Sequence, residues 1–184
     1  MVKGGAFTGD DLEFIAKQYH TLIRRVVEPY ESALNVIVNL ASFACKERPR
    51  AVLNIGVGSG ELAAKLLKRF PEAAITGIDP VEEFVKVARQ RFILESGKVE
   101  ISVGDPLSMN FSSPFDLVVA MLSLHRLSAE ERGTALRKIY DALSAGGLFI
   151  NCDFCPPDDA DAQNLYKRMW FKYLELNNLN PRRR

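Results

Sequence analysis

The segment AVLNIGVGSGELAAKLL, residues 51–67, joins a short apolar run to a glycine-rich turn and then to an amphipathic stretch. AVLNI is compact, apolar apart from Asn54, and followed by glycine, which predicts a buried parallel strand rather than a half-exposed one. Gly56, Gly58 and Gly60 follow it at G-x-G-x-G spacing. Because glycine has no Cβ, such a turn can bend tightly and let the backbone approach a ligand.

The same alternation of strand and helix continues to the end of the chain. Four further strand-like apolar runs follow, at residues 73–79, 99–105, 115–122 and 148–154. Helical periodicity lies between and after them, at residues 61–70, 81–92, 128–143 and 161–177. This order implies βαβ units with right-handed crossovers, and so an α/β fold with a parallel sheet and helices on both faces. Before residue 49, helical spacing on both sides of Pro29 predicts an N-terminal pair of helices.

Composition excludes several classes of protein. The chain has 184 residues, a net charge of +1 and 47% hydrophobic residues, which fits one globular unit. We expect no nucleic-acid partner, because phosphate binding needs clustered Lys and Arg. We also expect no membrane span and no signal peptide. Three cysteines are too few and odd in number for a disulfide framework, so we expect a cytoplasmic protein.

Acidic residues end two of the predicted strands. Asp79 follows the glycine turn by about 20 residues, where a carboxylate accepts hydrogen bonds from ribose hydroxyls. Asp105 ends the third strand, where a carboxylate could accept from an exocyclic amine such as that of adenine. The alternatives are a tight turn without a ligand, a surface Asp79 and a turn-forming Asp105. The G-x-G-x-G spacing differs from the G-x-G-x-x-G of most dinucleotide sites, which disfavours a dinucleotide-dependent oxidoreductase.

Five segments together resemble a known family. LNIGVGSGELAAKLL, ITGIDP, VGDP, FDLVVAMLSLHRLS and LSAGGLFINCDF resemble the class I S-adenosylmethionine-dependent methyltransferases. The similarity is to the type 12/25 branch, which includes carboxy-S-adenosylmethionine synthase and its methyltransferase-like relatives. It covers about residues 12–180. It implies an N-terminal helical cap over residues 1–48 and an S-adenosylmethionine-binding Rossmann-like domain over 49–184, together one structural unit.

The resemblance assigns roles residue by residue. It implies S-adenosylmethionine as cofactor and methyl transfer to a small-molecule acceptor. The glycine turn would line the methionine part of the cofactor, Asp79 would hold the ribose and Asp105 would recognise adenine. The full set of implied cofactor-binding residues is Tyr30, Asn54, Gly56, Val57, Gly58, Gly60, Asp79, Pro80, Asp105, Pro106 and Met121. Tyr30 would close over the cofactor, with simple helix packing as the alternative; Arg25 could approach the same site.

The sequence departs from the family pattern in three ways. Asn54 stands where the family has an acid that helps hold the cofactor's ammonium group, so the charge is missing. Only five of the usual seven strands are visible, as expected of a natural short form or a fragment, and 148–154 would then be an apolar edge strand. Such an edge invites cover by the last helix or pairing with another chain, and we expect a homodimer. No arginine matches the one that a carboxylated cofactor needs, which favours the ordinary cofactor.

His125, just past the fourth strand, is the candidate catalytic residue. Histidine suits proton abstraction near neutral pH, although a packing histidine is the alternative. We expect no metal site, with Cys152 and Cys155 as buried structural thiols. The aromatic stripe around Trp170 is expected to be a packing face of the last helix, with the floor of a lid or an interface exposed by the shortened C-terminus as the alternatives. A protein that binds S-adenosylmethionine without turnover, or a truncated domain, remains the alternative function.

Overall fold

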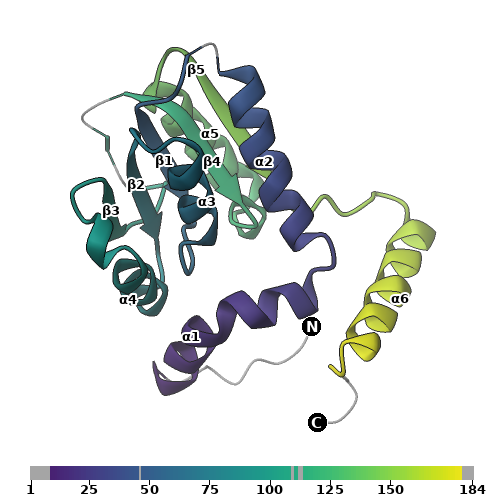
Figure 1. Cartoon of the computed structure of the whole chain (residues 1–184). Coiled ribbons are helices and arrows are strands. Elements are labelled where there is room, and N and C mark those ends of the chain that lie inside the picture. Colours follow the sequence, from purple (N-terminus) through teal and green to yellow (C-terminus); the bar gives the residue numbers. More distant parts are fainter. Residues whose placement is uncertain (1–8, 46, 109, 112–113, 180–184) are drawn as a thin grey trace.

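A five-stranded parallel sheet forms the centre of the molecule (Figure 1). The computed structural model describes residues 9–45, 47–108, 110–111 and 114–179. The strand order is β3-β2-β1-β4-β5. The strands are β1 (Ala51–Ile55), β2 (Ala74–Asp79), β3 (Val99–Val103), β4 (Phe115–Met121) and β5 (Leu143–Cys152). The predicted α/β architecture with a parallel sheet is confirmed.

Helices alternate with these strands. The α-helices are α1 (Gly9–Val26), α2 (Tyr30–Ala44), α3 (Glu61–Arg69), α4 (Glu82–Arg91), α5 (Ala129–Ala142) and α6 (Ala160–Leu176). Two short 3-10 helices are η1 (Ile93–Glu95) and η2 (Leu124–Arg126). Ser128 caps α5 with a capping box, in which its hydroxyl accepts from the N–H of Glu131 and the Glu131 carboxylate accepts from the N–H of Ser128. None of the described helices has the length and apolar character needed to cross a membrane.

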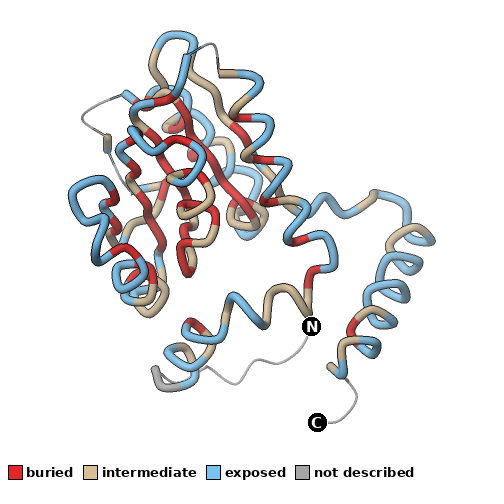
Figure 2. Tube along the Cα trace, viewed as in Figure 1, coloured by how far each residue is buried: buried red, intermediate tan, exposed pale blue. Residues whose placement is uncertain are grey.

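Helices cover both faces of the sheet, as predicted. On one face, Leu34 and Ile37 of α2 and Leu66 of α3 join a core cluster with Val52 of β1. On the other face, Ile139 of α5 packs in a second cluster that includes the central strands β1 and β4. Figure 2 shows the buried residues concentrated in these strands. Each fully buried Leu or Ile stabilises the fold by roughly 1.5–3 kcal/mol. Helix α2 contributes to the core of the sheet. The division into a cap over residues 1–48 and a domain over residues 49–184 stays a prediction.

The order of strands creates a switch point between β1 and β4. The chain runs from β1 outward to β3 and then returns to β4 on the opposite side of β1. Asn54, near the end of β1, is in register with Gly77 of β2 and Val119 of β4. Ligands of open α/β sheets bind at the carboxyl ends of strands beside such a switch point.

The fifth strand differs from its prediction. We expected residues 148–154, but β5 begins at Leu143, directly after α5. Phe115 of β4 pairs with Leu143, and Leu117 pairs with Leu148. Between these two pairs β5 advances five positions while β4 advances two. Gly146, at φ +81°, lies in this irregularity. Gly146 and Gly147, which precede the predicted strand, therefore lie in a bulge within the observed strand.

Helix α6 lies beside the end of α1 and away from the sheet (Figure 1). Trp170 Nε1 donates to the Val26 carbonyl at 2.8 Å, and the Tyr173 hydroxyl donates to the Arg24 carbonyl at 2.6 Å. The expected packing face is wrong for most of its length. Leu174 is buried, but the exposed aromatic residues are Tyr166 (63%), Trp170 (46%) and Phe171 (41%).

The cysteines also differ from expectation. Cys155 is exposed and Cys152 is half-buried, so the expectation of two buried thiols is wrong. The strand ends at Cys152, and the chain beyond it leaves the sheet. Cys155 therefore lies past the packed part of β5, where no neighbouring strand covers it.

Candidate functional site

The glycine turn after β1 forms the centre of the candidate site. Gly56, Gly58 and Gly60 have φ values of +65°, +53° and +84°, which side chains rarely adopt. A Cβ on Gly56 would lie 2.5 Å from Cβ of Ser123, and a Cβ on Gly60 would lie 2.7 Å from Cε2 of Phe92. Conformation therefore favours glycine at all three positions, and space also favours it at Gly56 and Gly60. The N-terminus of α3 directly follows this turn and therefore lies at the carboxyl edge of the sheet.

Asp79 ties this turn to the end of β2. The carboxylate is 7% exposed. Its Oδ2 accepts from the N–H of Gly58 at 2.9 Å, and its Oδ1 accepts from the N–H of Val81 at 3.0 Å. Burial raises the pKa of Asp79, and the two N–H donors oppose that rise. Each carboxylate oxygen can accept more than one hydrogen bond, so ligand hydroxyls can bind in addition. Pro80, beside it, is exposed.

Asn54 carries a buried acceptor without a partner. The residue is 1% exposed, and its Nδ2 donates to the Ile55 carbonyl at 3.3 Å. Within the described part of the chain, Asn54 Oδ1 and Ser59 Oγ have no hydrogen-bond partner. A buried acceptor left unsatisfied costs about 1–3 kcal/mol. A ligand that donates a hydrogen bond at the end of β1 would remove that cost.

The turn after β3 lies next to Asp79. The N–H of Gly104 donates to the Asp79 carbonyl at 3.1 Å. Asp105 is half-buried, and its Oδ1 accepts from the N–H of Leu107 at 2.8 Å. Pro106 is buried. Asp105 therefore stabilises a turn, which is the alternative role that its sequence position predicts. It does so at the same edge of the sheet as Asp79, and among the described residues its second carboxylate oxygen has no hydrogen-bond donor and can interact with a ligand.

The loop after β4 lies against the glycine turn. Met121 is 9% exposed and ends β4. Leu122 follows with φ +52°, and Ser123 then approaches Gly56. Arg126 lies close enough for its charge to lower the pKa of Asp79. The backbone of Leu122 keeps this strained conformation because the loop turns toward the glycines directly after β4.

His125, the predicted catalytic residue, pairs with an aspartate that the sequence reasoning missed. Nδ1 of His125 lies 2.5 Å from Oδ1 of Asp153. The side chains are 28% and 7% exposed. The ring of Phe154 meets the His125 ring nearly edge-on, with centroids 5.4 Å apart. A signal was available, because Asp153 directly follows β5 and so lies at the carboxyl edge like Asp79.

Tyr19, which the sequence reasoning also missed, lies over the glycine turn. A Cβ on Gly58 would lie 3.8 Å from Cε1 of Tyr19. The ring stands edge-on to Phe84 of α4, with centroids 4.9 Å apart. Burial raises the pKa of the Tyr19 phenol, and the charge of Asp79 adds to that rise. Helix α1 therefore brings an aromatic ring to the site.

Three other sequence-selected residues have structural partners. Tyr30 is 6% exposed, with the Arg24 guanidinium 5.5 Å from its ring centre, and burial raises its pKa. The Val57 side chain is 4% exposed and belongs to the core, which leaves its main chain at the turn. Arg25 donates to the Asn177 carbonyl at 2.6 Å, which directs it toward the residues after α6.

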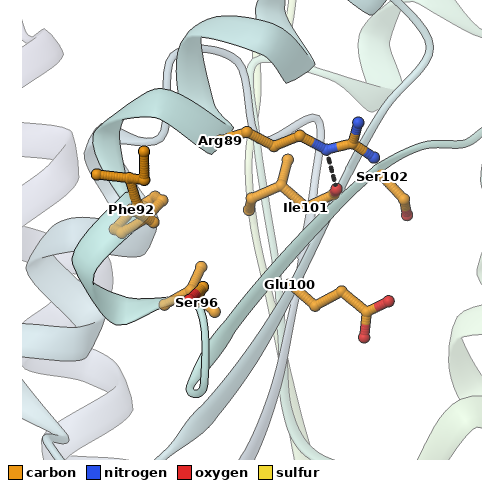
Figure 3. Close-up of a pocket in the computed structure, with 8 residues that line it drawn as sticks. Arg89, Phe92, Ser96, Glu100, Ile101 and Ser102 are labelled. Carbon is orange, nitrogen blue, oxygen red and sulfur yellow. Dashed lines mark hydrogen bonds between the residues drawn. The ribbon is translucent and has the colours of Figure 1, made fainter.

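A pocket of about 490 Å³ lies elsewhere, at the free edge of β3 (Figure 3). Its lining includes Phe92, Ser96 and Glu100. Arg89 Nε donates to the Ile101 carbonyl at 2.7 Å across it. No predicted site residue lines this pocket. The glycine turn, Asp79, the turn after β3 and the loop after β4 gather instead at the carboxyl edge. Helix α1 lies below this edge in Figure 1.

Known proteins match both the sequence and the fold. An uncharacterized methyltransferase of Geobacillus sp. (strain WCH70) is 31% identical over 145 residues, which are 78% of this chain and 62% of that protein. A demethylmenaquinone methyltransferase of Thermus thermophilus is 28% identical over 130 residues, 70% of this chain and 58% of that protein. The chain therefore spans about 60% of the length of these curated relatives.

Solved structures share the fold at lower identity. DesVI of Streptomyces venezuelae has a TM-score of 0.65 at 21% identity, covering 78% of this chain and 58% of that one. CalS10 of Micromonospora echinaspora, an amino pentose methyltransferase solved with S-adenosylmethionine, has a TM-score of 0.66 at 18% identity, covering 86% and 61%. The family described as "Methyltransferase domain" matches residues 52–147, just over half of the chain. The chain therefore belongs to this methyltransferase domain family.

Proposed function

We propose that this chain binds S-adenosylmethionine at the carboxyl edge of its sheet and transfers the methyl group to a small-molecule acceptor. One observation carries the proposal: the buried Asp79 carboxylate is held by the glycine turn, beside the switch point. This pairs an acceptor for ribose hydroxyls with a backbone that a ligand can approach closely. The family match supports the reaction class.

The hydrogen-bond acceptors of the site fit this cofactor. Asn54 Oδ1 has no partner in the described chain and is an acceptor for an ammonium group. Asp79 accepts from the ribose, and Asp105 accepts from the exocyclic amine of adenine. Gly56, Gly58, Gly60 and the Val57 main chain approach the methionine part, with Pro80, Pro106, Met121 and Tyr30 as the remaining proposed contacts. When bound, S-adenosylmethionine supplies a methyl group on a sulfonium that leaves as a neutral thioether.

The protein's part in the reaction is to position the acceptor and to take up a proton. Much of the rate gain in an in-line displacement comes from holding the nucleophile in line with the methyl group. His125 is the proposed general base, since it lies one loop from the glycine turn and its ring is 28% exposed. Small-molecule acceptors agree with the names of the Thermus relative and of CalS10.

The alternative is a protein that binds S-adenosylmethionine without turnover. Asn54 favours it, because an amide lacks the charge that strengthens a hydrogen bond to an ammonium group. The test is release of the homocysteine product across a panel of amines, phenols, quinols and amino sugars. Product release above the rate of a His125→Ala control supports transfer. Binding without product release for the whole panel would contradict turnover and leave the binding function.

Three properties of the whole protein belong to the same proposal: its localisation, its partners and its oligomeric state. We place the protein in the cytoplasm and expect no nucleic-acid partner. We also expect a homodimer, because no described residue pairs with the outer edge of β5 and α6 lies beside α1 instead. Sedimentation velocity at micromolar concentration tests the dimer. A single species of monomer mass would contradict it.

A further inference from the structure

Both carboxylate oxygens of Asp153 contact the loop that follows β4. Its Oδ2 accepts from the N–H of Leu124 at 2.9 Å and from the N–H of His125 at 3.0 Å. Its Oδ1 contacts Nδ1 of His125 at 2.5 Å. Three contacts to one carboxylate fix its orientation, and the carboxylate in turn fixes the plane of the imidazole ring. The end of β5 thereby positions a side chain that follows β4.

This contact also decides which ring nitrogen carries the hydrogen. An ionised carboxylate only accepts hydrogen bonds, so Nδ1 of His125 must donate to it. A neutral ring then has its lone pair on Nε2. The ring is 28% exposed and meets Phe154 edge-on, so part of it remains accessible. The structure thus combines a fixed tautomer with an accessible ring.

We propose that Asp153 is a positioning residue that accepts from Nδ1–H of His125 and so holds the ring in the Nδ1–H tautomer, in which Nε2 takes a proton from an O–H or N–H acceptor. The inference rests on the proposed function and narrows its substrate class. The acceptor oxygen or nitrogen forms the bond to the methyl carbon while the carbon–sulfur bond breaks with its electron pair to sulfur. The proton passes from the acceptor to Nε2, and the imidazolium faces the Asp153 carboxylate. A methyl acceptor that carries no O–H or N–H proton would not need His125 as a general base.

Asp153→Asn gives a specific prediction. The two backbone donors of Leu124 and His125 still require an acceptor, so the amide oxygen of the asparagine turns toward them. Its NH₂ group then faces Nδ1 and donates to it. His125 must therefore carry its hydrogen on Nε2, and the lone pair for the acceptor proton is lost. Shape and packing change little, because Asn and Asp have nearly the same size.

Nitrogen NMR tests this without an acceptor or a cofactor. The chain contains two histidines, His20 and His125, and a His20→Gln variant assigns the signals after ¹⁵N-histidine labelling. Long-range ¹H–¹⁵N spectra at about pH 8 separate the two neutral tautomers. We expect Nδ1–H for His125 in the wild type and Nε2–H in Asp153→Asn, with His20 unchanged. An Nε2–H tautomer in the wild type would overturn the proposal, even if the variant failed to fold.

A matched pair of probes tests the acceptor class. Phenol carries an O–H group, and anisole has the same ring without it. We expect phenol to move the Nε2 resonance of His125 at a concentration where anisole does not. Equal shifts, or none with either probe, would overturn the assignment of an O–H or N–H acceptor. Cofactor binding is measured separately by calorimetry, and its failure would contradict the proposed function while leaving the tautomer result intact.

Discussion

At the scale of single residues, Asp79 combines burial with two main-chain donors, and burial has the larger effect on its pKa. The folded protein therefore binds the proton of Asp79 more tightly than the unfolded chain. The corresponding stability is complete below the unfolded pKa, about 3.9, and is lost as the pH rises through the higher folded pKa. Asp79→Asn removes this titration. Urea denaturation should show that the free energy of unfolding, wild type minus variant, is larger at pH 4 than at pH 7. A difference that is constant or reversed would contradict this.

Gly56 shows a second residue-scale constraint, because it combines a φ of +65° with close approach to Ser123. Gly146 has a similar φ of +81° but open space around it. An Ala at either position adds backbone strain of about 1–3 kcal/mol. Gly56→Ala also overpacks Ser123, which adds about 1–3 kcal/mol. Chemical denaturation should therefore show a larger loss for Gly56→Ala than for Gly146→Ala. Equal losses would mean that Ser123 moves away freely.

The sequence predicted residues whose roles follow from their place after a strand. The glycine spacing and Asp79 belong to this group, since β1 and β2 pair in parallel and end together. The place of Tyr19 over the glycine turn and the pairing of Asp153 with His125 were missed for a physical reason. Their contacts depend on how a helix or a loop from elsewhere in the chain crosses the carboxyl edge, and His125 and Asp153 are 28 positions apart. Helical periodicity places Tyr19 on an apolar face but does not identify what that face covers.

At the scale of elements, α6 is held by few contacts. Its hydrogen bonds to the end of α1 come from Trp170 and Tyr173, and Leu174 is its one residue in the described core. An element with so little buried surface opens before the rest. Trp170 is the single tryptophan of the chain, so its fluorescence reports on α6. We expect the fluorescence transition in urea to precede the loss of far-UV circular dichroism.

A matched pair of variants sharpens this expectation. Tyr173→Phe removes the hydrogen bond to the Arg24 carbonyl, worth about 1 kcal/mol, and should lower the urea midpoint of the fluorescence transition. Tyr166→Phe makes the same chemical change at a position that is 63% exposed on the same helix, and should leave the midpoint unchanged. Coincident fluorescence and dichroism transitions, or equal effects of both variants, would show that α6 unfolds with the sheet.

Element boundaries were predictable where the hydrophobic period was uninterrupted. The central strands β1 and β4 are apolar runs interrupted only by Asn54 and Asp116, and they appear where the sequence places them. The start of β5 was not predictable, because Gly146 and Gly147 signal a turn while the sheet accommodates them as a bulge. The stripe on α6 has helical spacing, but spacing alone does not specify whether a neighbouring element covers it.

At the scale of the whole molecule, two hydrophobic clusters on opposite faces hold β1 and β4 in place. The ends of these strands and of β2 therefore form a rigid edge, and this edge carries the glycine turn, Asp79 and the His125 loop. A preorganised edge of this kind binds a ligand with little reorganisation. Fold and cofactor site are thus consequences of the same strand order.

The most direct measurement is isothermal titration of the full chain with S-adenosylmethionine, its homocysteine product and NAD. Wild type should bind the first two and not NAD. Asp79→Ala should weaken binding at least about tenfold, because a hydrogen bond to a charged group contributes about 1.5–3 kcal/mol. Asp141→Ala, which removes an exposed carboxylate on α5, should bind like wild type. Folded wild-type protein that binds neither compound, or an Asp79→Ala variant that binds as tightly as wild type, would contradict the assignment of the site.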